Sequence, residues 1–518
     1  KLFGKTDVKS VKTTVGPEQE YFLIDEDVYN KRKDLIYTGR TLFGAKPPKG
    51  QELEDHYFGI IKPRVQAFMK ELNDELWKLG ILAKTEHNEV APAQHELAPI
   101  FTTTNIAADH NQLTMEIMQK VAKKHHMVCL LHEKPFAGVN GSGKHNNWSL
   151  TTDTGVNLLN PGDTPYENAQ FLTFLCAVIK AVDEYQDMLR VSVASAGNDH
   201  RLGANEAPPA VVSMFLGTEL TDVLKAIEKD EPYGSKEKEI LKIGVHTLPK
   251  FPKDSTDRNR TSPFAFTGNK FEFRMLGSSS SVSCTNVVLN TAVAEELKQF
   301  ADELEGAANF EEALHELIKK TITDHKRIIF NGNGYDDAWI AEAEKRGLPN
   351  LKDTVAALAH YSDKDVMAVF ERHGVLSPRE MLSRQEILLE NYTHSVSIEG
   401  HTALKLGRTR ILPVALAYQT RLAKAASSAA ALVEDAAEEK AYFVRVREQV
   451  RGLMSALDTL EAAVNGDFGG TALARAAYAR DTVLPAMNAC RNHADALECL
   501  CASHDWPLPS YAELLWLH

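Results

Sequence analysis

Acidic residues recur in short, separated motifs of the N-terminal half, at spacings that can place carboxylates side by side. Glu18 and Glu20 lie within a segment typical of a β-strand, 11–25. They would therefore point to the same face, with Cα atoms roughly 7 Å apart. Glu89 and Glu96 bracket a proline-containing bend that could bring two extended arms together. Adjacent carboxylates repel unless a proton or a cation lies between them, so either pair could hold a metal ion. An exposed strand face would also explain Glu18 and Glu20, and a salt-bridged pair near the surface would also explain Glu89 and Glu96.

A glycine-rich segment with a following histidine could supply a nitrogen ligand. Residues 138–145, GVNGSGKH, nearly match the phosphate-binding loop GxxxxGK[ST], but His145 stands where a hydroxyl should bind Mg²⁺. No apolar strand of the usual kind precedes the segment, so we exclude that loop type. We expect instead a tight turn that presents His145 and Asn147 at the start of a strand, 146–150. A single histidine is more often structural than a ligand.

Charged residues also alternate with phenylalanines further along the chain. Lys270, Glu272 and Arg274 would share one face of a short strand, 271–276, with aromatic side chains on the other face. An amphipathic sheet edge would give the same pattern. Together, many glutamates with one histidine favour hard divalent ions such as Mg²⁺ or Mn²⁺ over structural zinc.

Two arginines and a loop glutamate could complete such a site. Arg201 and Arg260 suit bidentate binding of a carboxylate or a phosphate. Glu206 lies in a loop, GANEAPP, whose glycine and prolines suit a flap. Divalent metals combined with arginine are typical of phosphoryl transfer, in which catalysis is mostly positioning and charge neutralisation.

The elements that must position these residues change in character along the chain. Residues 1–300 mix predicted strands and helices, including one helix predicted from Asn105 to His132 with Thr104 as its cap. Residues 301–402 show charged amphipathic helices, and 403–518 are mostly Ala-rich and helical, for example 422–450. We expect a catalytic core, a helical continuation of it and a C-terminal helical region, respectively.

Composition limits the classes of function. The 518 residues carry 58 Lys and Arg against 71 Asp and Glu, a net charge of −13, and 43% of them are hydrophobic. This composition is globular, and the acidic balance argues against nucleic-acid or anionic-membrane binding. The longest apolar run, 171–182, is too short to span a bilayer. Six cysteines in so long a chain favour a reducing compartment, and we expect a cytoplasmic protein.

Several separated motifs together resemble the glutamine synthetase family, and their sequences are similar to those of its type III class. They are GPEQEYFLID (16–25), NEVAPAQHELAP (88–99), NGSGKHNNWSL (140–150), RLGANEAPPA (201–210), NRTSPFAFTGNKFEFRMLGSS (259–279), YTHSVSIEGHTALKLGRTRILPVALAYQ (392–419) and DWPLPSYAELL (505–515). The resemblance is specific because the motifs follow the family's order. It implies an α+β fold, a bowl of antiparallel β-strands walled by helices, here with additional C-terminal helices.

The resemblance also implies a role for each motif residue. One metal ion would be held by Glu20, Glu89 and Glu96, and a second by Glu18, His145 and Glu272. Glutamate would contact Asn140, Gly141, Arg201 and Arg274, and the nucleotide would lie near Asn147, Ser149 and Lys270. Arg260 would neutralise the transferring phosphoryl group, and Glu206 would close the site and take a proton from ammonium.

The implied reaction joins ammonium to L-glutamate through a γ-glutamyl phosphate, with ATP as co-substrate and two or more Mg²⁺ or Mn²⁺ ions per site. Self-association into stacked rings, a dodecamer, is implied too. The family's small N-terminal β-grasp domain is not found here, and we expect that an N-terminal piece is absent. Two alternatives stay open. One is a related ligase that joins glutamate to another amine, and the other is a scaffold that keeps only the fold.

Overall fold

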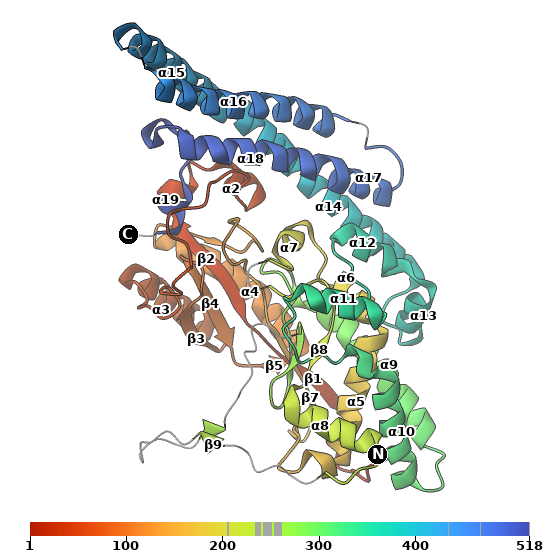
Figure 1. Ribbon diagram of the computed structural model, residues 1–518. Coiled ribbons are helices and arrows are strands. Elements are labelled where there is room, and N and C mark those ends of the chain that lie inside the picture. The colour runs from red at the N-terminus through yellow and green to blue at the C-terminus, as the bar shows by residue number, and fades with distance from the viewer. Residues whose placement is uncertain are drawn as a thin grey trace.

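Two β-sheets form the centre of the structure and helices cover them, as the computed structural model shows (Figure 1). It describes residues 1–204, 207–233, 262–433, 435–466 and 468–516, together with two short strands at 240–241 and 251–252. The strands are β1 Val11–Pro17, β2 Gln19–Asp25, β3 Ala83–Asn88, β4 Gln94–Pro99, β5 Thr102–Thr103, β6 Met127–Leu130, β7 Asn146–Thr152, β8 Met214–Phe215, β9 Ile240–Leu241, β10 Phe251–Pro252, β11 Phe264–Phe266 and β12 Phe271–Phe273.

The larger sheet has six strands in the order β5-β1-β7-β12-β11-β8, and the smaller has four in the order β3-β4-β2-β6. Neighbouring strands in both sheets are antiparallel, apart from the parallel pair β8 and β11. Strands β9 and β10 pair with each other. Antiparallel sheets walled by helices agree with the fold class predicted from the sequence.

Helices make up most of the rest of the chain. Those of the first 330 residues are α1 Glu26–Tyr29, α2 Lys33–Thr38, α3 Pro63–Lys78, α4 Thr104–Lys124, η1 Pro165–Glu167, α5 Ala169–Glu184, α6 Gln186–Val191, α7 Ala196–Arg201, α8 Gly217–Glu228, α9 Val282–Leu304, α10 Phe310–His325 and η3 Lys326–Ile328. Those that follow are α11 Asp337–Lys345, α12 Thr354–Leu358, η4 Ala359–Ser362, α13 Lys364–Arg372, α14 Pro378–Leu406, η5 Gly407–Ile411, α15 Leu412–Leu432, α16 Ala437–Val464, α17 Ala472–Tyr478, η6 Ala479–Val483, α18 Leu484–Leu500, η7 Ser503–Asp505 and α19 Tyr511–Leu515.

The predicted single strand 11–25 is in fact two strands in different sheets. β1 belongs to the larger sheet and β2 to the smaller one, and Glu18 lies between them. The interpretation of Glu18 and Glu20 as neighbours on one strand face was therefore wrong. β1 pairs with β7 as far as Pro17, and the Glu18 amide still donates to the carbonyl of His145 at 3.0 Å. From Gln19 onward the chain pairs with β4 instead, so the change of sheet occurs at Glu18.

The predicted helix from Asn105 to His132 is shorter than its pattern indicated. α4 ends at Lys124, and its N-cap is Thr103 rather than Thr104. His126 has a φ of 54°, a left-handed conformation that ends a helix. The apolar residues after it form β6, which pairs with β2. The pattern of apolar residues continues past the end of α4 because the buried residues of β6 are apolar as well.

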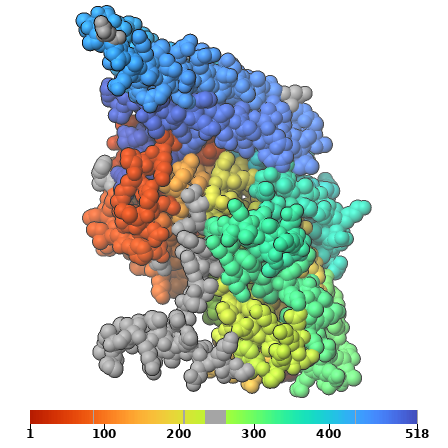
Figure 2. Space-filling view, in the orientation of Figure 1, coloured from red at the N-terminus to blue at the C-terminus, as the bar shows by residue number. Residues whose placement is uncertain are grey.

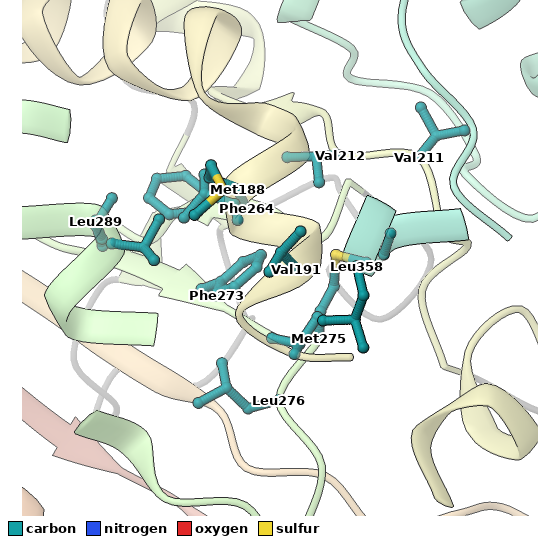
Figure 3. Close-up of a cluster of buried hydrophobic side chains, with 14 of the residues drawn as sticks. Met188, Val191, Val211, Val212, Phe264, Phe273, Met275, Leu276, Leu289 and Leu358 are labelled. Carbon is teal, nitrogen blue, oxygen red and sulfur yellow. The ribbon is translucent and has the colours of Figure 1, made fainter. Parts of the chain in front are cut away.

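A large apolar core supports the strand that carries Glu272. Phe271 and Phe273 are fully buried, as the alternation predicted, and the strand itself ends at Phe273 rather than at residue 276. Figure 3 shows Phe264 and Phe273 within a cluster that also contains Met188, Val191 and Met275. A second apolar cluster lies beneath the smaller sheet. Both sheets are thus held from behind by close-packed side chains, which leaves their polar residues in fixed positions.

The C-terminal helices extend along one side of the molecule, in blue in Figures 1 and 2. α14 continues across residue 402, where a domain boundary was predicted, and its buried residues share one core with strands of the larger sheet. The predicted domain boundaries stay predictions. The segment 422–450 is not one helix, because α15 ends at Leu432 and α16 begins at Ala437. All six cysteines are free. Within the described residues, every helix is too short or too polar to cross a membrane.

Candidate active site

Three predicted ligands from distant parts of the sequence meet at the start of β7. His145 precedes this strand, Glu18 lies at the crossing after β1, and Glu272 is in β12, the next strand on the other side. The Nδ1 atom of His145 is 3.0 Å from Glu18 Oε2 and 2.8 Å from Glu272 Oε1. One ligand atom from each residue lies within 4.8 Å of the others, a grouping that could hold a metal ion.

A second group lies on the smaller sheet. Glu20 and Glu96 face each other across β2 and β4, and Glu89 follows β3. His87 completes the group, with its Nε2 2.8 Å from Glu89 Oε1 and 3.4 Å from Glu96 Oε1. Sequence reasoning missed His87. The signal was the alternate spacing of His87 and Glu89, which places both on one face of an extended chain.

Glu20 connects the two groups. Its Oε2 accepts a hydrogen bond from the Gly143 amide at 2.5 Å, and its Oε1 is 3.8 Å from His145 Nε2. The carboxylates of both groups therefore crowd into one polar region between the sheets. Such crowding is unfavourable unless positive charge compensates it.

The directions of the pKa shifts show that this region favours bound protons or other positive charge. Burial, reinforced by the charges of Glu18 and Glu89, raises the pKa of Glu96 well above its usual value. Burial also raises the pKa of Glu20, and the neighbouring charge of Glu89 adds to the effect. For His145 burial acts in the opposite sense, but its hydrogen bonds with Glu18 and Glu272 raise its pKa well above the usual value.

The donor set fits divalent metal ions. Five carboxylates surround two imidazoles, and protonation of both imidazoles would still leave negative charge in a partly buried region. Carboxylate-rich sites with few nitrogen ligands suit Mg²⁺ or Mn²⁺. Glu18, His145 and Glu272 would hold one ion, as predicted. The second group that the structure brings together is His87, Glu89 and Glu96, so the predicted set of Glu20, Glu89 and Glu96 stays a prediction.

The predicted glutamate-binding residues line the neighbouring loop. Asn140 is buried, and its amide and side-chain oxygen both bond to Gln51, at 2.9 and 2.7 Å. A Cβ on Gly141 would lie 2.3 Å from the carbonyl oxygen of Glu133, so this close approach requires glycine. The loop is thus fixed tightly against the protein.

The two predicted arginine ligands of glutamate are both buried. The guanidinium of Arg201 donates to the carbonyls of Arg274 and Leu276, at 3.1 and 3.2 Å. Arg274 donates to the carbonyl of Ser262 at 2.7 Å. In this conformation Arg201 holds the chain that follows β12, and its contact with substrate stays a prediction.

Of the residues predicted to bind nucleotide, Asn147 and Ser149 lie in β7 and Lys270 directly precedes β12. Asn147 donates to Glu18 Oε1 at 3.0 Å, so it orients a predicted metal ligand. Ser149 donates to the carbonyl of Asn269 at 3.0 Å, next to Lys270. Glu206 and Arg260 lie outside the described residues, so their roles stay predictions.

The glycine-rich segment does not form a phosphate-binding loop, as expected. Lys144, the lysine of the GxxxxGK pattern, is fully buried and donates to Asn111 Oδ1 at 2.8 Å and to the carbonyl of Ser280. These internal hydrogen bonds occupy its ammonium group. The turn serves instead to bring His145 to the start of β7.

Comparisons with known proteins identify the family of this chain. A sequence model of the glutamine synthetase catalytic domain matches residues 3–212, and one of the glutamine synthetase C-terminal domain matches 313–430. A glutamine synthetase from Butyrivibrio fibrisolvens is 50% identical, covering 100% of this chain and 74% of that protein. The chain belongs to the glutamine synthetase family. A type-3 glutamine synthetase from Dictyostelium discoideum is 46% identical over 98% of this chain and 71% of that protein, which confirms the resemblance to the type III class.

A third sequence relative carries the same family name. A glutamine synthetase from Bacteroides fragilis is 45% identical, covering 99% of this chain and 72% of that protein. Among solved structures, one titled GmaS/ADP complex matches with a TM-score of 0.44 and 16% identity, over 74% of this chain and 70% of that one. The family membership rests on the sequence relatives.

Proposed function

We propose that the protein is a glutamine synthetase that joins ammonium to L-glutamate with ATP, giving L-glutamine, ADP and phosphate. The single observation that carries the proposal is the convergence of Glu18, His145 and Glu272 from three separate sequence motifs into one group. A non-catalytic scaffold would not be expected to keep such crowded carboxylates, because uncompensated buried charge is destabilising. Membership of the glutamine synthetase family supports the same reaction.

The proposed reaction has two steps. The side-chain carboxylate of glutamate attacks the γ-phosphorus of ATP, and the bond from that phosphorus to the ADP oxygen breaks, giving γ-glutamyl phosphate. Ammonia then attacks the acyl carbon, loses a proton and displaces phosphate. Bound Mg²⁺ or Mn²⁺ would supply charge neutralisation for the phosphate oxygens.

The residues of this chain bind and orient the reactants in the proposed scheme. Asn140 and Gly141, with Arg201 and Arg274, hold glutamate. Asn147, Ser149 and Lys270 lie toward the nucleotide. Arg260 neutralises the transferring phosphoryl group, and Glu206 covers the site, excludes water from the acyl phosphate and accepts a proton from ammonium.

The wider proposal concerns metal, assembly and location. The carboxylate-rich donor set favours Mg²⁺ or Mn²⁺ as the native ions. The family resemblance supports stacked rings, with a dodecamer as the expected particle, and a cytoplasmic location. Particle mass measured by analytical ultracentrifugation would test the assembly directly, and a monomer at all concentrations would contradict it.

The decisive experiment replaces Glu272 with alanine. Glu272→Ala should abolish glutamine formation from glutamate, ATP and ammonium, and should reduce the rise in melting temperature on adding Mn²⁺. The matched control is Glu303→Ala, which removes an exposed glutamate near the end of α9. Undiminished activity in Glu272→Ala would refute the metal assignment. Turnover of a bulkier amine, with none of ammonium, would indicate the related glutamate–amine ligase instead.

A further inference from the structure

A cavity of about 880 Å³ lies where the N-terminal helices α1 and α2 approach the C-terminal end of the chain. Its walls come from residues 30–48, from the junction of α14 and η5, and from 498–513. None of the residues proposed for the active site lines it. The volume is in the range of small-molecule sites.

Positive side chains surround this cavity. Lys31, Lys33 and Lys46 come from the N-terminal segment, and Arg410 comes from η5. Lys46 pairs with Glu52 at 3.0 Å. In the part of the chain that the structure describes, no carboxylate pairs with Lys31, Lys33 or Arg410. A cluster of unpaired cations is unexpected in a chain with a net charge of −13, and it attracts anions.

The carboxylates of the cavity wall already have hydrogen-bond donors. Glu498 accepts from the amide of Ala45 at 2.9 Å. Glu513 accepts from the amide and the hydroxyl of Ser510, at 2.7 and 2.8 Å, in a capping box at the start of α19. Both side chains are oriented by these bonds but keep their negative charge. The four cations that line the cavity still outnumber its two carboxylates, so a net positive charge is left for a ligand.

The walls are tied together before any ligand binds. Arg32 is fully buried, pairs with Asp34 at 2.5 Å, and donates to the carbonyls of Phe43 and Pro509, at 2.6 and 2.8 Å. Its contacts therefore join the N-terminal wall to the C-terminal wall. A cavity whose walls are held in this way loses little ordering entropy when a ligand enters.

Apolar groups complete the lining, among them Trp506, Leu406 and four prolines. A ligand that satisfies both surfaces has an organic skeleton and more than one negative charge. We propose that this cavity binds a small organic polyanion, one that carries two or more carboxylate or phosphate groups. The site is separate from the proposed active site, and its occupation does not depend on the proposed reaction.

Isothermal titration calorimetry on the full chain tests the proposal with two probes. Tricarballylate represents polycarboxylates and fructose 1,6-bisphosphate represents phosphate esters, each titrated at a fixed concentration of free Mg²⁺. We expect at least one probe to bind, and binding to weaken as salt rises toward about 0.15 M and beyond, because the cations are exposed.

Charge-reversal variants locate the binding. Lys31→Glu combined with Lys33→Glu, and separately Arg410→Glu, should weaken it by about tenfold or more, since each removes an attraction and adds a repulsion. Lys405→Glu is the matched control, because it is exposed on α14 but does not line the cavity. All of these side chains are exposed, so melting temperatures should stay near that of the unaltered chain.

The outcomes separate clearly. The probe that binds tells whether the ligand is a polycarboxylate or a phosphate ester. Binding of a probe that survives unchanged in the Lys31, Lys33 and Arg410 variants would place it elsewhere, for example in the active site, and would overturn the proposal. Failure of both probes to bind the unaltered chain would overturn it too. Because the measurement needs no turnover, an inactive preparation would contradict only the proposed function.

Discussion

The buried ion pair between Arg40 and Glu399 offers a sharp test of how the C-terminal helices are attached. Arg40 follows α2, whereas Glu399 belongs to α14, 359 residues later. The pair is bidentate, with Nε and Nη2 each 2.7 Å from a carboxylate oxygen. The side chains are only 12% and 5% exposed. A charge left without its partner at such a site is strongly destabilising.

The contribution of this ion pair to stability follows from the pKa of Glu399. Burial alone would raise it, but the charge and hydrogen bonds of Arg40 lower the pKa of Glu399 from 4.5 to about 2. A lowered pKa means that the ion pair contributes fully above the unfolded value and is lost as the pH falls toward the folded value. The difference between the folded and unfolded pKa values corresponds to a contribution of about 3 kcal/mol to the free energy of unfolding at neutral pH. Near pH 3 the contribution is about half of that.

Urea denaturation of Glu399→Gln is the assay. We expect the free energy of unfolding to fall by about 3 kcal/mol near pH 7, and this loss to shrink as the pH approaches about 3. The control is Asp302→Asn, which breaks the exposed pair with Lys298 and should change stability by less than about 1 kcal/mol. A loss in Glu399→Gln no larger than the control, or one independent of pH, would refute the reasoning.

Two further predictions concern the buried residues Glu296 and Gly143. Burial raises the pKa of Glu296, 2.6 Å from Lys180, to about 7, so its contribution to stability is present at low pH and is lost as the pH rises through that value. Glu296→Gln should therefore flatten the decline of melting temperature between about pH 4.5 and pH 7, and an unchanged slope would contradict this. A Cβ on Gly143 would lie 2.1 Å from Arg201 Nη2, so Gly143→Ala should lower kcat/KM for glutamate by about a hundredfold. Gly306→Ala, which meets nothing within 4 Å, is its control, and equal kinetics in the two variants would count against the packing argument.

Local patterns in the sequence were sufficient for part of the fold. The alternation around Glu272 placed Phe271 and Phe273 in the core, because strand side chains point to opposite faces in turn. The long helices of the C-terminal half were predictable for a similar reason, since a helical period repeats over many residues. A feature that follows from a pattern repeated within one helix or strand can be predicted from the sequence without knowledge of the tertiary structure.

Features that depend on a distant partner were not readable in this way. Glu18 looked like a strand residue because its neighbours are strand-like, but the identity of the sheet on each side of it depends on pairing with β7 and with β4. α4 ends where the backbone of His126 turns to positive φ, and neither neighbouring apolar pattern marks that point. The spacing of His87 and Glu89 could indicate that these two lie together, but the approach of His87 to Glu96 depends on the pairing of β3 with β4.

The candidate site is built at the junction of the two sheets, which explains why its ligands are so widely separated in sequence. The Glu18 amide donates to His145 and the Glu20 amide donates to Gly143, at 3.0 and 3.3 Å, so two backbone hydrogen bonds fix the crossing chain against the turn before β7. The Gly143 amide in turn donates to the Glu20 carboxylate. One short crossing thus sets the distance between the ligands of both proposed ions. A change in the turn should therefore disturb both groups together, whereas a change within β12 should affect the group of Glu272 first.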